Sequence, residues 1–166
     1  AAYSKHESLR RKLASRRALF SDTFSRVVSR LLGQEAQAKA DLSGRTIQLD
    51  IDKQGALTSA AIETLKVLAF DLAALAASME GRGWHPRFLI HDGPREADMQ
   101  PSVYHRLFHL ARDLESAYGR AQPGFQFIIT TTTEPPDDMS EGSEWMLDPI
   151  LSGTNAAERL LGINLA

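Results

Sequence analysis

Asp92 is the residue whose type and position first suggest chemistry. It follows a run of large apolar side chains within residues 88–94, FLIHDGP, and a Gly-Pro pair then stops the run. Such a run is typical of a strand that is buried on both faces inside a parallel sheet. An acid at the carboxyl end of such a strand lies at the crevice where open α/β sheets bind their ligands. Asp92 is therefore the first candidate for ligand or metal chemistry, and the alternative is that it only caps a turn.

Two hydroxyl groups form the second candidate. Thr58 and Ser59 lie at the start of an apolar segment, about Leu57–Met79, that we expect to be a central helix. Hydroxyls in this place cap free backbone N–H groups, and the positive end of a buried helix is also a natural phosphate site. The residues leave both roles open, an ordinary helix cap or a phosphate contact.

Histidines suggest a further chemistry. His105 and His109 have the i, i+4 spacing of metal-chelating helices, but no Glu follows His105 as it does in zinc proteases. The sequence contains neither the Gly-x-Ser-x-Gly motif of serine hydrolases nor a GxxxxGK phosphate-binding loop. A small independent hydrolase that uses Asp92 with His91 or His105 stays open as an alternative.

Composition narrows the classes of protein. The chain has 166 residues, enough for one domain with a real core, and 43% of them are hydrophobic. Its net charge of −2 is not that of a polycation built for nucleic acid. The absence of cysteine excludes disulfides and thiolate chemistry and fits a cytoplasmic protein. The longest apolar stretch, residues 65–77, is interrupted by Lys66 and Asp71, so we expect no membrane partner.

The first thirty residues predict one long basic helix over residues 4–32, which Gly33 ends. A heptad seam with spacings of 4, 3, 4, 3 and 4 runs along it, made of Leu13, Arg17, Phe20, Phe24, Val27 and Leu31. Eight Lys and Arg side chains lie in the same stretch. They form either a solvated face or a contact for DNA.

The remaining segments predict an α/β fold. We expect a polar linker at 34–44, a strand at Arg45–Ile51 with Ile47, Leu49 and Ile51 on its buried face, a turn at 52–55, a helix at 102–118, a strand at Phe125–Thr133 and a last strand at 159–165. Alternating strands and helices imply a small, mostly parallel sheet with flanking helices and right-handed crossovers. The expected organisation is a helix at 1–33, the end of a possible coiled coil, and a single α/β domain at 34–166.

The order of these features resembles the second lobe of an ABC-type ATPase head, in the branch of coiled-coil ATPases that includes structural-maintenance-of-chromosomes, RecN and RecF-like proteins. In that family a long coiled coil separates a first lobe, with the Walker A loop, from a second lobe with the signature motif, Walker B strand, D-loop and switch. This chain has no Walker A loop, so it resembles the second lobe alone. The resemblance implies half of a P-loop NTPase fold.

The resemblance also implies roles for two of the candidates. Residues 88–92 are similar to a Walker B strand, in which Asp92 would hold Mg²⁺ through water. Ser59 resembles the signature serine, which contacts the γ-phosphate of ATP bound by a second head. Residues 54–61, QGALTSAA, depart from the usual LSGG pattern of that motif.

Three more residues take roles by resemblance. Asp98 resembles the acid of the D-loop, and Thr131 stands about where the switch residue falls. The residue after the Walker B aspartate is normally a glutamate that positions the attacking water, and here it is Gly93. Glu96 is the nearest acid that could replace it, so hydrolysis is expected to be slow, to use another base or to be absent.

The function implied is that of an ATPase lobe with ATP and Mg²⁺ as cofactors. Its partners would be a Walker A lobe and a second ATPase head in a homodimer, with DNA as a further partner. The alternative is a non-catalytic α/β interaction module with a degenerate ATPase fold, in which the helix at 4–32 is a dimerisation handle. Gly93 favours this alternative.

Overall fold

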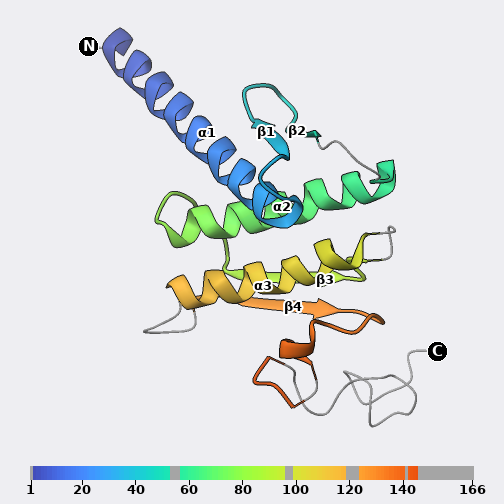
Figure 1. The fold of residues 1–166 in the computed structure, drawn as a ribbon. Coiled ribbons are helices and arrows are strands. Elements are labelled where there is room, and N and C mark those ends of the chain that lie inside the picture. The colour runs from blue at the N-terminus through green and yellow to red at the C-terminus, as the bar shows by residue number, and fades with distance from the viewer. Residues whose placement is uncertain (1, 53–56, 96–98, 119–123, 141, 146–166) are drawn as a thin grey trace, which may run out of the picture. The chain divides into compact units, whose positions relative to one another are not determined.

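The computed structural model describes residues 2–52, 57–95, 99–118, 124–140 and 142–145, and these fall into two compact units, Ala1–Thr133 and Glu134–Ala166. The first unit holds, in order, α1 (Ala2–Leu32), β1 (Gln37–Asp41), β2 (Gln48–Asp52), α2 (Ser59–Met79), β3 (Phe88–Asp92), α3 (Pro101–Tyr118) and β4 (Gln126–Thr130) (Figure 1). The described part of the second unit has one 3₁₀ turn, Asp137–Met139. The predicted last strand at 159–165 lies outside the described residues.

The helix predicted at residues 4–32 is confirmed. α1 ends at Leu32, and the N–H of Gly33 donates to the carbonyl of Ser29 over 2.9 Å. Gly33 has a φ of 112°, a conformation that L side chains rarely adopt, and a Cβ there would meet the Glu35 carboxylate. Glycine is therefore required where the chain leaves α1.

The predicted linker at 34–44 is wrong, because β1 lies within it and pairs with β2 in an antiparallel hairpin. No large apolar side chain marks β1 in the sequence. Its place on α1 depends instead on small residues, since Ala36 and Ala40 are buried and the N–H of Ala40 donates to Ser21 Oγ over 3.1 Å. A strand held by such contacts has no alternation of large apolar residues to reveal it.

The strand predicted at Arg45–Ile51 is confirmed in part. β2 places Leu49 and Ile51 against the core, but Ile47 precedes the strand and is 54% exposed, so the prediction for Ile47 is wrong. The turn at 52–55 lies mostly outside the described residues.

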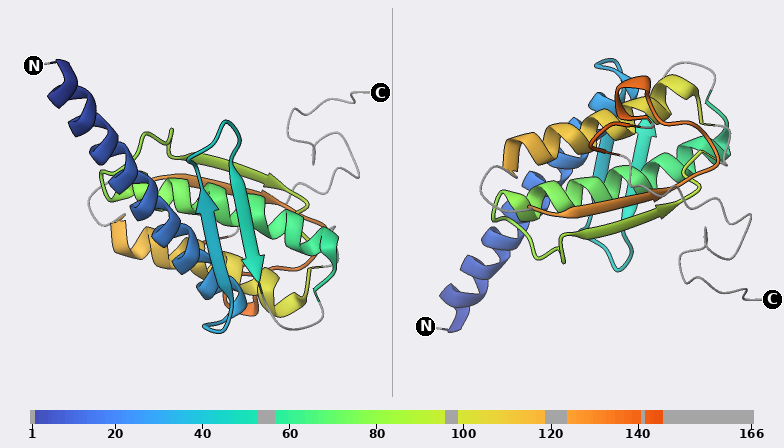
Figure 2. Two further views of the ribbon diagram at one scale, coloured as in Figure 1. Left: turned by 90° about the horizontal axis from the view of Figure 1, so that it is seen from above. Right: turned by 90° about the horizontal axis from the view of Figure 1, so that it is seen from below.

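The β1–β2 hairpin lies on the opposite side of α2 from β3 and β4 (Figures 1 and 2). β2 therefore does not join the parallel sheet in which the sequence placed it.

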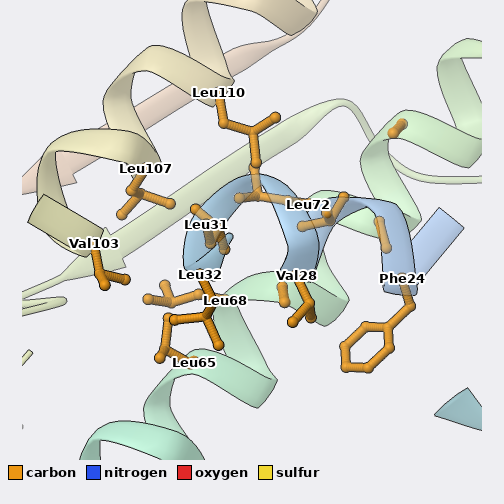
Figure 3. Close-up of a cluster of buried hydrophobic side chains, with 14 of the residues drawn as sticks. Phe24, Val28, Leu31, Leu32, Leu65, Leu68, Leu72, Val103, Leu107 and Leu110 are labelled. Atoms are coloured by element: carbon orange, nitrogen blue, oxygen red, sulfur yellow. The ribbon is translucent and has the colours of Figure 1, made fainter. Parts of the chain in front are cut away.

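The central helix is confirmed. α2 buries ten of its residues, among them Leu65, Leu68, Leu72 and Leu75, and side chains from α1 and α3 complete the same cluster (Figure 3). It is also the most apolar of the three helices. Within the described ranges, no helix has the length and hydropathy needed to cross a membrane.

The predicted unit of strand, helix and parallel strand is present as β3, α3 and β4. The two strands pair in parallel register from Phe88 with Gln126 to Asp92 with Thr130. Figure 2 shows α2 and α3 on one face of this pair. The class is therefore α/β, with one antiparallel and one parallel pair among the described strands.

β3 is not buried on both faces, and that prediction is wrong. Leu89 and His91 point into the core, whereas Phe88 and Ile90 are 44% and 55% exposed. The apolar run misled the prediction because the helices of this chain cover one face of the strand only. The outward face of β3 is apolar and uncovered by the described residues.

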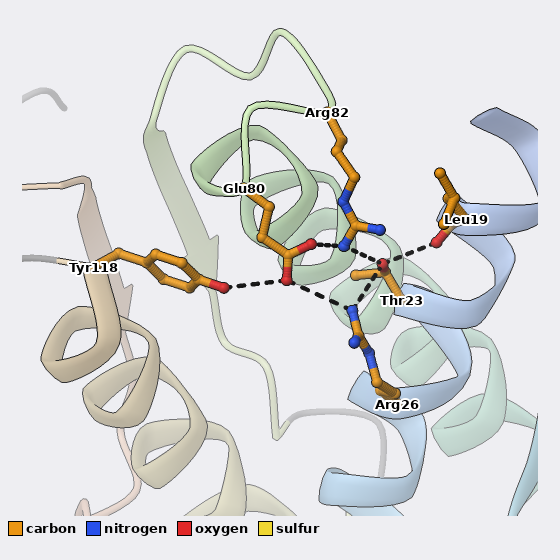
Figure 4. A network of polar contacts seen from close by, with 6 residues as sticks. All are labelled: Leu19, Thr23, Arg26, Glu80, Arg82 and Tyr118. Atoms are coloured by element: carbon orange, nitrogen blue, oxygen red, sulfur yellow. Dashed lines mark hydrogen bonds and ion pairs between the residues drawn. The ribbon is translucent and has the colours of Figure 1, made fainter. Parts of the chain in front are cut away.

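Polar contacts join the helices at the end of the unit where α2 and α3 finish (Figure 4). Glu80, which caps α2, forms an ion pair with Arg82, lies 3.6 Å from Arg26 of α1 and accepts a hydrogen bond from Tyr118 of α3 over 3.1 Å. Both arginines also contact the buried hydroxyl of Thr23. A second ion pair, Arg30 with Asp113, joins α1 to α3.

Candidate functional site

Asp92 ends β3 with its side chain exposed on the outward face of the strand pair. The hydroxyl of Thr130, its register partner on β4, donates a hydrogen bond to Asp92 Oδ1. The N–H of Gly93 donates to the carbonyl of Thr130 over 2.9 Å, and Gly93 turns the chain away with a φ of 53°. Backbone and side-chain contacts together therefore fix the position of the carboxylate at the end of the sheet.

A pocket of about 500 Å³ opens beside this end of the sheet. The loop after β3 supplies Gly93 and Arg95, Gln100 directly precedes α3, and the loop after β4 supplies residues 131–133, all three of them threonines. The lining thus offers a guanidinium group, an amide and hydroxyls. Such groups favour an anionic or highly oxygenated ligand such as a phosphate.

Tyr104 of α3 binds the threonine segment that lines the pocket. Its side chain is completely buried, and its hydroxyl donates to Thr131 Oγ1 over 2.9 Å or to the carbonyl of Thr133 over 3.0 Å. Burial raises the pKa of the Tyr104 phenol, while the hydrogen bond with Thr131 and the charge of Arg95 oppose that rise. The guanidinium of Arg95 lies 6.0 Å from the centre of the tyrosine ring, at the limit of a cation–π contact.

The structure places two of the five predicted site residues at the same end of the strand pair. Asp92 ends β3 and Thr131 follows the end of β4, and of the two only Thr131 lines the pocket. Ser59 is the first residue of α2, and that end of α2 lies at the same end of the unit as the carboxyl ends of β3 and β4 (Figures 1 and 2). Glu96 and Asp98 lie outside the described residues.

Thr58, rather than Ser59, caps α2. The N–H of Ala61 donates to Thr58 Oγ1 over 3.1 Å, and Thr58 has the extended backbone of a helix N-cap. The sequence alone did not show which of the two hydroxyls caps the helix and which is free for a ligand contact. The structure assigns the cap to Thr58. Ser59 is exposed in the first turn of the helix.

His91 faces away from Asp92, because successive side chains of a strand point to opposite faces. Its Nε2 lies 3.0 Å from Asp71 Oδ2 on α2, its ring packs edge-on against Phe127, and its buried Nδ1 has no hydrogen-bond partner. The two residues cannot act on one substrate from this strand. The alternative of a small hydrolase that pairs Asp92 with His91 is therefore wrong.

Sequence reasoning missed Thr130 and Tyr104, and gave Arg95 no role of its own. The strand prediction through Thr133 included Thr130 but could not give its register opposite Asp92. Tyr104 lies next to Val103 on the inward face of α3, where its spacing from Leu107 marked a core position and nothing more. The pairing of β3 with β4 brings Thr130 to Asp92, and the packing of α3 brings Tyr104 to Thr131.

The side chains at this end of the sheet fit Mg²⁺, which keeps water ligands, better than a metal that is bound by protein side chains alone. No cluster of three or more His, Asp or Glu side chains that could hold a metal occurs among the residues described. Mg²⁺ usually keeps several waters and binds one or two carboxylates together with substrate phosphates. Asp92 offers one exposed carboxylate, and the residue after it, Gly93, lines the pocket, although Asp92 itself is not part of the lining.

Comparison with known protein families gives a match over most of the chain. A family model described as an uncharacterised protein conserved in bacteria, DUF2326, matches residues 27–165. A search of curated proteins finds no match.

Proposed function

The chain belongs to the bacterial DUF2326 family, and we propose that it is the C-terminal lobe of a coiled-coil ABC-type ATPase head. In this role it contributes to Mg–ATP binding and to ATP-dependent pairing of two heads, in DNA repair, chromosome maintenance or defence within the cytoplasm. The observation that carries the proposal is the position of Asp92 at the carboxyl end of a parallel strand, directly before Gly93, with which the lining of the threonine-rich pocket begins.

Electrostatics at this end of the unit support a phosphate ligand. The N-termini of α2 and α3 both lie here, and each brings the positive end of a helix dipole (Figure 1). Arg95 adds a full positive charge at the pocket wall. Together these groups offset the negative charge of a nucleotide, which a pocket lined by acids would repel.

Each candidate residue has its own role in the proposed function. Asp92 holds the hydrated Mg²⁺, which supplies charge neutralisation at the phosphates, and Thr131 contacts the terminal phosphate from the switch position. Ser59 reaches the nucleotide of the opposite head, and Asp98 acts in the D-loop. Glu96 takes the place of the glutamate that Gly93 replaces. Without a carboxylate directly after Asp92, we expect slow hydrolysis, lower by about a hundredfold or more.

The open sheet supports the finer fold proposal, half of a P-loop NTPase head. A two-stranded parallel sheet with one bare apolar face is rare by itself, because parallel sheets are normally covered on both faces. Phe88 and Ile90 present that bare face in the described structure. A Walker A lobe that adds strands and a covering helix would bury both side chains.

The test uses a polypeptide that joins this chain to a Walker A lobe. Asp92→Asn keeps the shape of the side chain but loses the charge, so Mg–ATP-dependent pairing of heads, measured by light scattering, should disappear. Asp113→Asn is the matched control, because Asp113 lies on α3 outside the pocket lining and pairs with Arg30 of α1. Pairing that survives Asp92→Asn would place the metal elsewhere.

The chain by itself offers a second test. Without a Walker A loop, the 166-residue protein should show no ATP turnover above the background of a phosphate-release assay. Robust turnover that Asp92→Asn removes would overturn the proposal of a dependent lobe.

A non-catalytic interaction module is the second candidate, favoured by Gly93 and by the bare face of β3. In that case Ile90→Lys, which puts a charge on the bare face, should abolish partner binding while Asp92→Asn leaves it unchanged. The ATPase proposal expects Asp92→Asn to be the damaging substitution. The two substitutions therefore separate the two candidates.

A further inference from the structure

The N-terminal half of α1 lies outside the packed core. Residues 5–16 are all exposed, and Figure 1 shows this half of the helix extending away from the other elements of the first unit. Leu9 and Leu13 are 56% and 49% exposed. An isolated helix of this length is marginal in water, because most helical stability in proteins comes from packing of an apolar face.

The exposed leucines continue the face that packs α1 into the core. Leu9 and Leu13 are followed at intervals of 7, 4 and 3 residues by Phe20, Phe24 and Val27, and at 3.6 residues per turn these five side chains form one stripe. Phe24 and Val27 are buried against the core, and Phe20 packs against it. The stripe therefore has a covered half and an uncovered half on the same helix.

Positive charges border the uncovered half on both sides. Residues 5–17 contain six Lys and Arg side chains and one Glu. The helical repeat places Lys12 and Arg16 on one side of the leucine stripe and Arg10 on the other. Glu7 lies on the opposite face, where it forms an ion pair with Arg11 over 2.6 Å. The charge next to the leucines is thus exclusively basic.

We infer that the N-terminal half of α1 docks an amphipathic helix of a partner protein, with leucine-like residues on its contact face and Asp or Glu along both borders. Opposite charges at the borders of a helix pair favour pairing and choose the partner. A second copy of this chain would set basic borders against basic borders. Nucleic acid would match the charge but leave Leu9 and Leu13 uncovered. The inference does not depend on the nucleotide site.

The helices described in this chain do not supply such a partner. α2 is apolar on most sides, and α3 carries Arg106 and Arg112 against Asp113 and Glu115, so neither has an acidic amphipathic face. None of the described helices of this chain can therefore be the partner helix.

The probe is a designed helical peptide with Leu at the a and d positions and Glu at the e and g positions, and its matched peptide has Lys at e and g. Fluorescence anisotropy of each labelled peptide is measured against the 166-residue protein. The Glu peptide should bind, and more weakly as salt rises, because salt screens exposed charges. The Lys peptide should not bind. Failure of the Glu peptide to bind overturns the inference.

Variants of α1 identify the docking surface. Leu9→Ser combined with Leu13→Ser should weaken binding of the Glu peptide by about tenfold or more, because two buried leucines are lost. Arg16→Glu should weaken it as well, by reversing one border charge. Arg11→Glu is the matched control, with the same charge change on the opposite face, and should change binding by less than about twofold. Equal effects of Arg11→Glu and Arg16→Glu would overturn the docking geometry.

The same variants distinguish an acidic helix from two other possible ligands of this surface, nucleic acid and a second copy of the chain. Tight binding of duplex DNA that the Leu9→Ser, Leu13→Ser variant retains, without binding of the Glu peptide, would replace the inference with a nucleic-acid contact. Dimers in sedimentation equilibrium that the same variant abolishes would replace it with self-association. All of the substituted side chains are exposed, so circular dichroism melting should show unchanged folding of the core.

Discussion

At the scale of single residues, Tyr104 links the core to the candidate site. Its ring belongs to the buried cluster and contacts Phe108 edge to face, with ring centres 5.0 Å apart. Its hydroxyl is the only polar atom of the side chain and is bonded to the threonine segment that lines the pocket. A shift of α3 would therefore move Thr131, and the packing of the helix determines the shape of the pocket.

Tyr104→Phe should lower the free energy of unfolding by about 1 kcal/mol at pH 7, the net value of a buried hydrogen bond. Burial raises the Tyr104 pKa above its ordinary value of 10.0. Above pH 10 the unfolded chain loses this proton before the folded chain does, so the wild type loses stability that the variant does not. The gap between the two proteins in urea titrations should shrink between pH 7 and pH values above 10.

Tyr118→Phe controls for removal of a tyrosine hydroxyl, because Tyr118 is exposed and donates to Glu80 at the surface. It should cost less than about 0.5 kcal/mol at either pH. A gap for Tyr104→Phe that stays constant with pH would show that burial does not hold the proton on Tyr104.

At the scale of secondary structure, the start of α2 separates a structural hydroxyl from a candidate ligand contact. Thr58→Ala removes the acceptor of the Ala61 N–H and should cost about 1 kcal/mol of unfolding free energy in thermal or urea melts. Ser59→Ala, one residue later, should change stability by less than about 0.5 kcal/mol. In a polypeptide that joins this chain to a Walker A lobe, Ser59→Ala should reduce ATP-dependent pairing of heads more than Thr58→Ala does. Equal losses of stability would mean that both hydroxyls serve the helix end.

The elements that could be predicted from the sequence are those whose own side chains carry the pattern. α2 and α3 have large apolar residues at helical spacing, and β3 has an unbroken apolar run between turn residues. β1 could not be predicted, because its alanines become a buried face only when α1 lies against them. The exposure of Ile90 also depends on what covers the sheet, which a local pattern does not contain.

For the candidate site, too, the sequence could predict only what local patterns carry. The position of Asp92 follows from its place after an apolar strand, and Thr131 from its place at the end of the next one. The bonds from Thr130 to Asp92 and from Tyr104 to Thr131 depend on register and on the packing of α3. Those are tertiary properties, so the sequence could name the ends of the strands but not the contacts between them.

At the scale of the whole molecule, the large hydrophobic cluster among the described residues lies in the first unit. The buried cluster and the side chains packed against it all lie between Phe20 and Ile129, and the compact unit ends at Thr133. The contacts that join α1, α2 and α3 around Glu80 also lie within these bounds. Residues 1–133 therefore contain the described interactions that hold the three helices together.

A chain that ends after Thr133 should therefore fold by itself. We expect one cooperative thermal transition, with a midpoint within about 5 °C of that of the full chain, since a loss of about 1 kcal/mol shifts the midpoint of such a domain by only a few degrees. Leu72→Ala in the shortened chain is the reference for true core damage, because Leu72 is fully buried and its truncation should cost about 2–5 kcal/mol. If the shortened chain melts without cooperativity, or loses as much stability as Leu72→Ala causes, then residues 134–166 contribute to the fold and the unit boundary at Thr133 is not a folding boundary.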